Sequence, residues 1–171
     1  MRRLPRIVRA IASIRYHAST RALLGMCLAP AVARAQLHHP NLSGTWVMNA
    51  AKSRLEVPVP DSTIFVIHHD EPIVRIFRTH ATGGTLDTVT VVLRTDSSEA
   101  DWALRGTKLT GRSWWVGDEL VFWTGFADRD RPGSQVVRYS VSADGKTFTA
   151  VERVDTPEVK HVNRWVFDRR E

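Results

Sequence analysis

Residues 134–155 read SQVVRYSVSADGKTFTAVERVD, and their pattern decides the fold class. Two runs rich in valine, threonine and aromatic residues flank the pair Asp144-Gly145. An Asp-Gly pair tolerates the positive φ angles of a tight hairpin turn, whose twist matches that of the flanking strands. Apolar and polar residues alternate along both runs, as expected for strands with one buried face. The stretch therefore predicts an antiparallel β-hairpin.

The same pattern of short strands and turns continues from Gly44 to the end of the chain. Gly117-Asp118 predicts a second hairpin turn, and no long stretch shows the repeat of an amphipathic helix. We expect ten strands, at 44–49, 63–69, 73–80, 86–94, 100–104, 108–116, 119–127, 134–141, 147–155 and 160–169. Consecutive antiparallel strands of this number curl, and closure into a barrel removes the exposed edges. The prediction for 43–171 is an all-β, up-and-down barrel of about 8–10 strands.

The first 35 residues differ from the rest in charge. They contain seven arginines and no acidic residue, which leaves 17 basic and 18 acidic residues in 36–171. The net charge of +6 therefore belongs to this leader, and a nucleic-acid-binding domain is disfavoured. The apolar run 22–33 is too short to span a bilayer, and it ends at Ala33-Arg34-Ala35, a small-x-small cleavage pattern.

These features predict a secretory signal peptide over 1–35, with Gln36 as the first mature residue. The alternatives are a mitochondrial-type presequence, a misassigned start codon, or lipidation at Cys27, which the bulky Met26 disfavours. Cleavage removes the only cysteine, so the mature chain has no disulfide and no thiolate. We expect an exported, periplasmic or extracellular monomer with a flexible lead-in at 36–42 and no stable membrane insertion after cleavage.

The segment 41–55, NLSGTWVMNAAKSRL, resembles the opening of a family of small exported bacterial proteins with a lipocalin-like, calycin-type barrel and uncharacterised function. Three later segments match in order: WVGDELV at 115–121, YSVSADGKTFT at 139–149 and NRWVFDR at 163–169. The resemblance implies an internal cavity, no assigned catalytic residues and a binding role through architecture. It also implies that Trp46 packs across the closed end of the barrel, against Arg164 or Arg153.

Alternation gives one face of the predicted sheet its apolar side chains, and we assign this face to the interior. Its members are Trp46/Met48, Leu120/Phe122, Val137/Tyr139/Val141, Phe148/Ala150 and Trp165/Phe167. Gln135 and Thr124 help to make one end of this face polar. If a cavity exists there, the predicted ligand-binding residues are Tyr139, Glu152, Asn163, Phe122, Trp115 and Trp165. Alternatively, Tyr139 and Asn163 satisfy backbone groups, and Glu152 lies on the outer face.

The remaining residues favour binding over catalysis. No GxSxG sequence supplies a nucleophile, and the paired carboxylates fall mostly near turns. Adjacent histidines on a strand point to opposite faces, so His68 and His69 cannot share a metal, and we expect no metal or cofactor. The leading hypothesis is a non-catalytic barrel that binds a small, partly hydrophobic ligand. The alternatives are a packed interaction module of the cell envelope, with Trp114 or the His-rich lead-in on its contact surface, and a barrel enzyme of unknown substrate.

Overall fold

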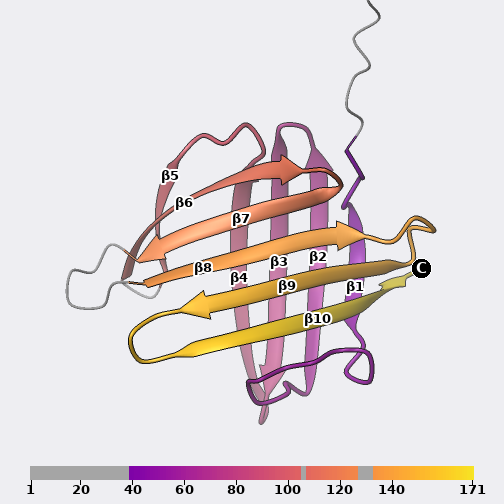
Figure 1. Cartoon of the computed structure of the whole chain (residues 1–171). Helices are drawn as coiled ribbons and strands as arrows, with labels where there is room; N and C mark the ends of the chain where they lie inside the picture. The colour runs from indigo at the N-terminus through magenta and orange to yellow at the C-terminus, as the bar shows by residue number, and fades with distance from the viewer. Residues whose placement is uncertain (1–38, 105–106, 127–132) are drawn as a thin grey trace, which may run out of the picture. The chain divides into compact units, whose positions relative to one another are not determined.

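The computed structural model describes residues 39–104, 107–126 and 133–171, and every regular element in these ranges is a β-strand (Figure 1). The strands are β1 (Gly44–Met48), β2 (Ser62–Asp70), β3 (Ile73–Thr82), β4 (Thr85–Arg94), β5 (Ala100–Leu104), β6 (Thr107–Val116), β7 (Glu119–Phe126), β8 (Gly133–Val141), β9 (Thr147–Asp155) and β10 (Lys160–Arg170). Each expected strand is present within two residues of its predicted ends, so the all-β class is confirmed. The predicted signal peptide lies outside the described residues.

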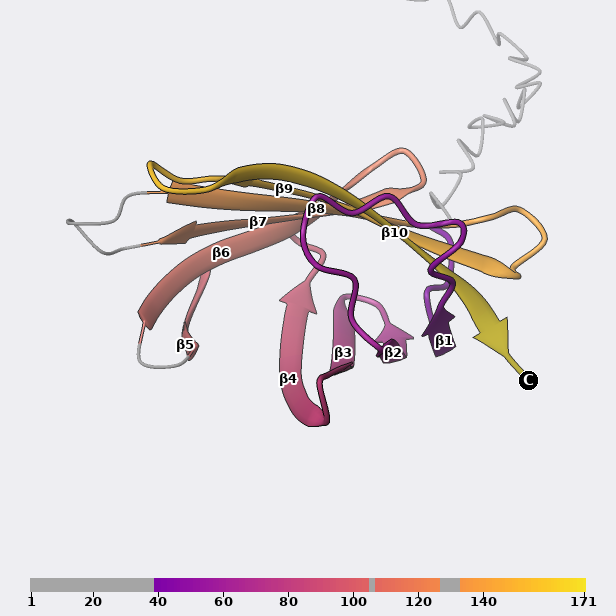
Figure 2. The ribbon, with the colours of Figure 1, turned by 90° about the horizontal axis from the view of Figure 1, so that it is seen from below.

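The ten strands form one antiparallel sheet in the order β4-β3-β2-β1-β10-β9-β8-β7-β6-β5. Neighbours in the sheet are neighbours in sequence, except that the first strand, β1, pairs with the last, β10. In Figure 1, β1–β4 run nearly at right angles to β6–β10, and Figure 2 shows these two groups as facing layers. The sheet therefore curls into a half-barrel, and the inward side chains of both layers meet between them.

The two edges of the curled sheet, β4 and β5, do not pair with each other. Instead β4 approaches β6, where Asp96 forms a bridge with Trp114. Here the Ser113 hydroxyl also donates to the Arg94 carbonyl at 2.9 Å. No continuous ladder closes this seam in the part of the chain that the structure describes. The predicted up-and-down barrel is therefore present as a half-barrel, whose edges β4 and β5 do not pair with each other. Ser97, which follows the Asp96 bridge, has a φ of 64°.

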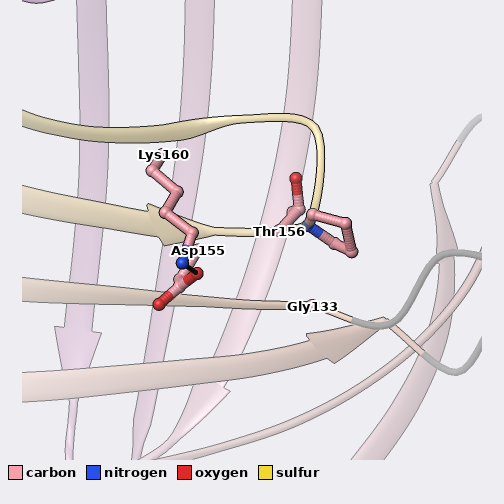
Figure 3. A pocket seen from close by; sticks show the side chains of 5 residues that line it. Gly133, Asp155, Thr156 and Lys160 are labelled. Carbon is pink, nitrogen blue, oxygen red and sulfur yellow. Dashed lines mark ion pairs between the residues drawn. The ribbon is translucent and has the colours of Figure 1, made fainter.

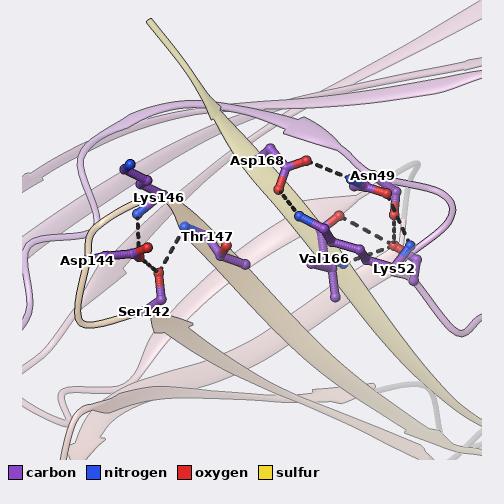
Figure 4. A network of polar contacts seen from close by, with 9 residues as sticks. Asn49, Lys52, Ser142, Asp144, Lys146, Thr147, Val166 and Asp168 are labelled. Carbon is purple, nitrogen blue, oxygen red and sulfur yellow. Dashed lines mark hydrogen bonds and ion pairs between the residues drawn. The ribbon is translucent and has the colours of Figure 1, made fainter.

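Glycine forms the two hairpin turns that the sequence predicts. Gly117, with a φ of 59°, lies between β6 and β7, and Gly145, with a φ of 69°, lies between β8 and β9. At the second turn the Asp144 carboxylate accepts hydrogen bonds from the Ser142 hydroxyl and the Lys146 N–H (Figure 4). The Asp-Gly-Lys-Thr segment of the resemblance thus has a structural role in this turn.

A polar network ties the connection between β1 and β2, residues 49–61, to the outer face of β10 (Figure 4). The Asp168 carboxylate accepts from the Asn49 amide at 2.6 Å and from the Lys52 ammonium at 2.8 Å. The Ser53 hydroxyl donates to the Asn49 carbonyl at 2.8 Å and accepts from the Val166 N–H at 3.0 Å. Asn49, Lys52 and Ser53, which belong to the segment 41–55 of the family resemblance, therefore attach this connection to β10.

One end of the half-barrel, which we call the aromatic end, is filled by packed rings. Phe148 lies at its centre, and its ring centroid is 5.4 Å from Trp46, 5.6 Å from Phe167, 5.7 Å from Tyr139 and 5.9 Å from Phe65. Trp46, Phe148 and Phe167 are fully buried. Large aromatic side chains contribute most to the burial of apolar surface in such a core. The face that alternation assigned to the interior is thereby confirmed.

The cation that covers Trp46 is Arg169, near the end of β10. Its guanidinium carbon lies 4.1 Å from the indole centroid, and the guanidinium donates to two backbone carbonyls. The prediction of Arg153 or Arg164 as this partner is wrong, because both side chains are exposed on the outer face. Arg169 instead continues the inward series of β10.

The described part of the lead-in, from His39 to Leu42, packs against the aromatic end. Leu42 is fully buried, and its carbonyl accepts the Trp46 indole N–H at 3.0 Å. The Leu42 N–H donates to His69 Nδ1 at 3.2 Å, and His39 stacks on Trp115 with 4.5 Å between ring centroids. These four residues of the predicted lead-in are therefore held by specific contacts, and its residues 36–38 lie outside the described ranges.

Candidate functional site

The opposite end of the half-barrel, which we call the polar end, contains an inward carboxylate with three hydrogen-bond donors. Glu152, on β9, accepts from the Asn163 amide at 3.0 Å, from the Trp165 indole N–H at 3.2 Å, and from the Gln135 amide. The donors come from β10 and β8, the two strands that flank β9. Glu152 and Asn163 therefore share the inward face as predicted, and the alternative that Glu152 lies outside is wrong.

Asn163 joins this carboxylate to the β1–β2 connection. Its side chain is fully buried, and its carbonyl oxygen accepts from the Glu56 N–H at 2.8 Å. The Glu56 carboxylate in turn accepts from the Val162 N–H at 2.9 Å. Asn163 thus satisfies a backbone N–H, as the alternative prediction for this residue stated. It also donates a hydrogen bond to the Glu152 carboxylate.

Three further polar side chains reach the polar end from β3 and β4, and the sequence reading did not select them. Arg78 and His80 follow Val74 and Ile76 on the inward face of β3, and Asp87 faces them from β4. The Arg78 guanidinium lies 4.0 Å from the Asp87 carboxylate. The buried Nε of Arg78 has no hydrogen-bond partner among the described residues.

His80 remains neutral at neutral pH. Its Nδ1 lies 2.7 Å from the hydroxyl of buried Thr63, and its ring centroid lies 5.6 Å from that of Trp165. Burial, followed by the positive charge of Arg78, lowers the pKa of His80 from 6.5 to about 4, against the opposing effect of two carboxylates. This imidazole therefore adds no positive charge to the polar end.

Tyr139 and Phe122 line the interior between the aromatic end and the polar end. They are 7% and 6% exposed, respectively. Burial raises the pKa of Tyr139 above its ordinary value of 10, so the phenol keeps its proton over the physiological range. Both predicted residues therefore supply uncharged interior surface.

A pocket of about 270 Å³ opens at the polar end, between the β1–β2 connection and the β3–β4 hairpin. It is lined by Pro58, Pro60, His80, Thr82, Thr85, Asp87 and Trp165. Asp61 anchors the connection at this place, because its N–H donates to the Ala81 carbonyl at 2.8 Å and its carboxylate accepts from the Gly83 N–H at 2.7 Å. Of the predicted ligand residues, Trp165 lines this pocket, and its indole N–H connects the wall to Glu152.

Trp115 lies apart from the cluster of Glu152, Asn163 and Trp165. It lies at the aromatic end, where its indole N–H donates to the Glu71 carboxylate at 2.7 Å. Glu71 also accepts from the Thr95 hydroxyl and contacts His69 Nε2 at 3.1 Å. Burial acts to raise the pKa of Glu71, but these hydrogen bonds outweigh it and lower the pKa. The pairing of Trp115 with Leu120 places it on the inward face, but alternation carries no information about which end of the barrel a residue occupies.

A second hollow, of about 350 Å³, lies on the surface at the β9–β10 turn (Figure 3). It is lined by Gly133, Asp155, Thr156, Pro157 and Lys160. The exposed Lys160 ammonium pairs with the exposed Asp155 carboxylate at 3.0 Å. This shallow hollow lacks the apolar wall that a specific small-molecule site requires.

The polar end offers hydrogen-bond acceptors, amide, indole and guanidinium donors, and an indole face. Within the described ranges, no group of three or more histidine, cysteine, aspartate or glutamate side chains is placed to hold a metal ion. No helix in these ranges has the length and hydropathy needed to cross a membrane.

Comparison with known proteins gives matches in structure alone. No family model and no curated protein matches the chain. Human cRBP IV matches with a TM-score of 0.53 and 16% identity, over 77% of this chain and 99% of its own. Fatty-acid-binding protein 1 of Echinococcus granulosus has a TM-score of 0.52 and 11% identity, over 76% and 98%. The zebrafish ileal bile acid-binding protein complexed with cholic acid has a TM-score of 0.51 and 12% identity, over 75% and 98%. The chain thus has the fold of a lipocalin-like β-barrel.

Proposed function

We propose that the protein is an exported, non-catalytic barrel that binds a small, partly hydrophobic ligand at its polar end. The observation that carries this proposal is the pocket of about 270 Å³, whose wall combines one indole and two proline rings with hydroxyl, imidazole and carboxylate groups. Sites for small molecules are concave and mostly apolar, with a few fixed polar groups. Two of the matched structures are by name a fatty-acid-binding and a bile acid-binding protein, which supports the proposal.

Hydrogen bonds behind the pocket hold its wall in one conformation. The Trp165 indole is hydrogen-bonded to Glu152, and Glu152 is hydrogen-bonded to Asn163. Asn163 in turn is hydrogen-bonded to the backbone of the β1–β2 connection. A wall that is already ordered loses little side-chain entropy when a ligand binds. Each 100 Å² of apolar ligand surface buried against it would then contribute about 2.5 kcal/mol.

Binding is tested with the full chain and a neutral apolar probe, naphthylethanol, in isothermal titration calorimetry. We expect one probe per protein, with affinity at least about tenfold lower for Trp165→Ala, because the apolar wall is lost. Trp123→Ala is the matched control, since Trp123 lies on the outer face of β7, where Arg112 is 5.6 Å from its ring centroid. No binding to the native protein, or equal losses in the two variants, would contradict the proposal.

Native mass spectrometry of the purified protein gives a second readout. A co-purified small molecule would support ligand binding, whereas a ligand-free protein that retains a protein partner would favour the interaction module. Export is tested by sequencing the N-terminus of the protein recovered outside the cytoplasm. We expect Gln36 as the first residue, and retention of residues 1–35 would contradict cleavage at Ala35.

A further inference from the structure

Two neighbouring rows of side chains cross the outer face of strands β6–β10, the front layer in Figure 1. Residues that pair across adjacent strands lie side by side on one face of a sheet, so the strand register defines both rows. The first row is formed by Trp114, Val121, Arg138, Val151 and Arg164. The second row is formed by Arg112, Trp123, Val136, Arg153 and Val162. We call these the arginine rows, because arginine is their only charged residue type.

The four arginines of the rows follow a zigzag across the layer, and all four are exposed. They are Arg112 on β6, Arg138 on β8, Arg153 on β9 and Arg164 on β10. Adjacent strands lie about 4.8 Å apart, so the zigzag extends over about 19 Å from β6 to β10. The positive charges are thus spread along a line and do not converge on one point.

Nearby carboxylates leave most of this charge unneutralised. Arg138 pairs with Glu119 at 3.1 Å, but no ion pair within the described ranges involves the other three arginines. Asp155, beside the rows on β9, is paired with Lys160 at 3.0 Å. The carboxylate of Glu56 lies at the β10 end of the rows, where it accepts from the backbone of β10. The exposed face therefore favours a partner with several negative charges.

An apolar floor lies between the arginines. Val121 is buried, and the valines of β8 and β9 in the rows are half-buried. The six-membered ring of the Trp123 indole packs against Gly125, where a Cβ would lie 2.7 Å from the ring. The indole is half-buried, so solvent reaches part of it. This floor can contact the apolar C–H face of a sugar ring.

We propose that the arginine rows bind an acidic polysaccharide, a linear chain of sugar rings that carry carboxylate groups. A guanidinium can form two parallel hydrogen bonds with one carboxylate, and arginine keeps its charge at any physiological pH. Successive acidic sugars of one chain can therefore pair with successive arginines of the zigzag. The rows lie on the outer face of the sheet and the pocket is lined from the inward face, so this inference does not depend on the proposed function.

A single-stranded nucleic acid fits these rows less well. Proteins that bind such strands combine a basic groove with several aromatic side chains on which successive bases stack. Trp123 and Trp114 both lie at the β6–β7 side of the rows, and the floor between the arginines of β8, β9 and β10 is valine. Bases would find no stacking surface along that part of the zigzag.

The test measures binding of three polymers to the full chain by calorimetry at low ionic strength and neutral pH. They are polygalacturonate, its methyl ester and oligothymidylate of similar length. We expect polygalacturonate to bind at least about tenfold more tightly than the ester, which has the same rings without the charge, and to weaken as salt is added. Equal binding of acid and ester, or no binding of the acid, would overturn the inference. Tighter binding of oligothymidylate would overturn it in favour of a nucleic acid.

A pair of double variants places the binding on the arginine rows. Arg153→Gln combined with Arg164→Gln should weaken polygalacturonate binding by about tenfold, because two ion pairs are lost. The matched control combines Arg75→Gln with Lys146→Gln, which removes two exposed positive charges from the outer face of β3 and from the β8–β9 turn. Both proteins keep the seven arginines of the leader, which therefore contribute equally. We expect less than about a twofold change in the control, and equal losses in the two variants, or no loss in the first, would overturn the inference.

Discussion

Acidification from neutral pH to about pH 4.5 should destabilise the barrel through one side chain, His80. The folded protein protonates this ring only near pH 4, whereas the unfolded chain does so near 6.5. Between these values the unfolded state binds more protons than the folded state. The contribution of neutral His80 is therefore complete above pH 6.5 and is lost as the pH falls toward 4.

The size of the effect follows from the surroundings of the ring. Burial of the ring is the largest cause of the lowered pKa, and Arg78, on the same inward face of β3, also repels a protonated His80. Asp87 and Glu152, on β4 and β9, oppose these effects incompletely. The difference between the pKa of 6.5 in the unfolded chain and about 4 in the folded protein corresponds to about 3 kcal/mol of the free energy of unfolding, without screening. Because His80 is half-buried, solvent screens part of the added charge, and we expect a loss of about 1–2 kcal/mol.

Urea denaturation at several pH values between about 7.5 and 4.5 measures this loss. The matched variant is His80→Gln, whose amide can bond to Thr63 but does not titrate. Carboxylates with a lowered pKa, including Asp144 and Asp168, act below their ordinary value of 3.8 and do not interfere. The native protein should lose about 1–2 kcal/mol more than the variant over this range. If the free energy of unfolding changes equally with pH in the native protein and in His80→Gln, the reasoning is refuted.

Three further changes test the aromatic end by urea denaturation. Phe148→Ala should lower the free energy of unfolding by about 3–5 kcal/mol, because it empties the centre of the ring cluster, and a loss below about 1 kcal/mol would contradict that packing. Gly44→Ala should cost about 1–3 kcal/mol, since Gly44 has a φ of 147° and a Cβ there would lie 2.5 Å from the Arg169 guanidinium. This cost should shrink in an Arg169→Ala background, and an equal cost would exclude the clash. Glu71→Gln should cost at most about 1 kcal/mol at neutral pH, because solvent screens this partly exposed carboxylate. The cost should disappear as the pH falls through the lowered pKa of Glu71, and a cost independent of pH would exclude the ionic explanation.

The strands and their inward faces were predictable because both depend on local sequence. Side chains at every second position of a strand point to the same face, and apolar residues at these positions mark that face as buried. Phe148 and Ala150 therefore placed Glu152 on the inward face. The segments that carry the family resemblance also have local structural roles. Asp144 and Gly145 form a turn, while Asn49 and Lys52 attach the first connection to the last strand.

The full site was not predictable, because it depends on contacts between distant segments. On β3, Arg75 and Arg78 fall on opposite faces, and the usual exposure of arginine gave no reason to place Arg78 inside. The pocket wall needs Pro58, which reaches the polar end only because its connection crosses from β10 to the β3–β4 hairpin. The open seam at Ser97 depends on how far the sheet curls, which local alternation does not specify.

The pairing of β1 with β10 also has a consequence for the time at which the protein can fold. Asn49 and Asp168 are in direct contact although 119 residues separate them. On a ribosome, β1 lacks one of its two neighbours until β10 has been synthesised. Contacts of such high sequence separation slow folding and leave strand edges exposed in the meantime. Loss of β10 would take one of two neighbours from both β1 and β9, and would split the ten-stranded sheet into β4–β1 and β9–β5.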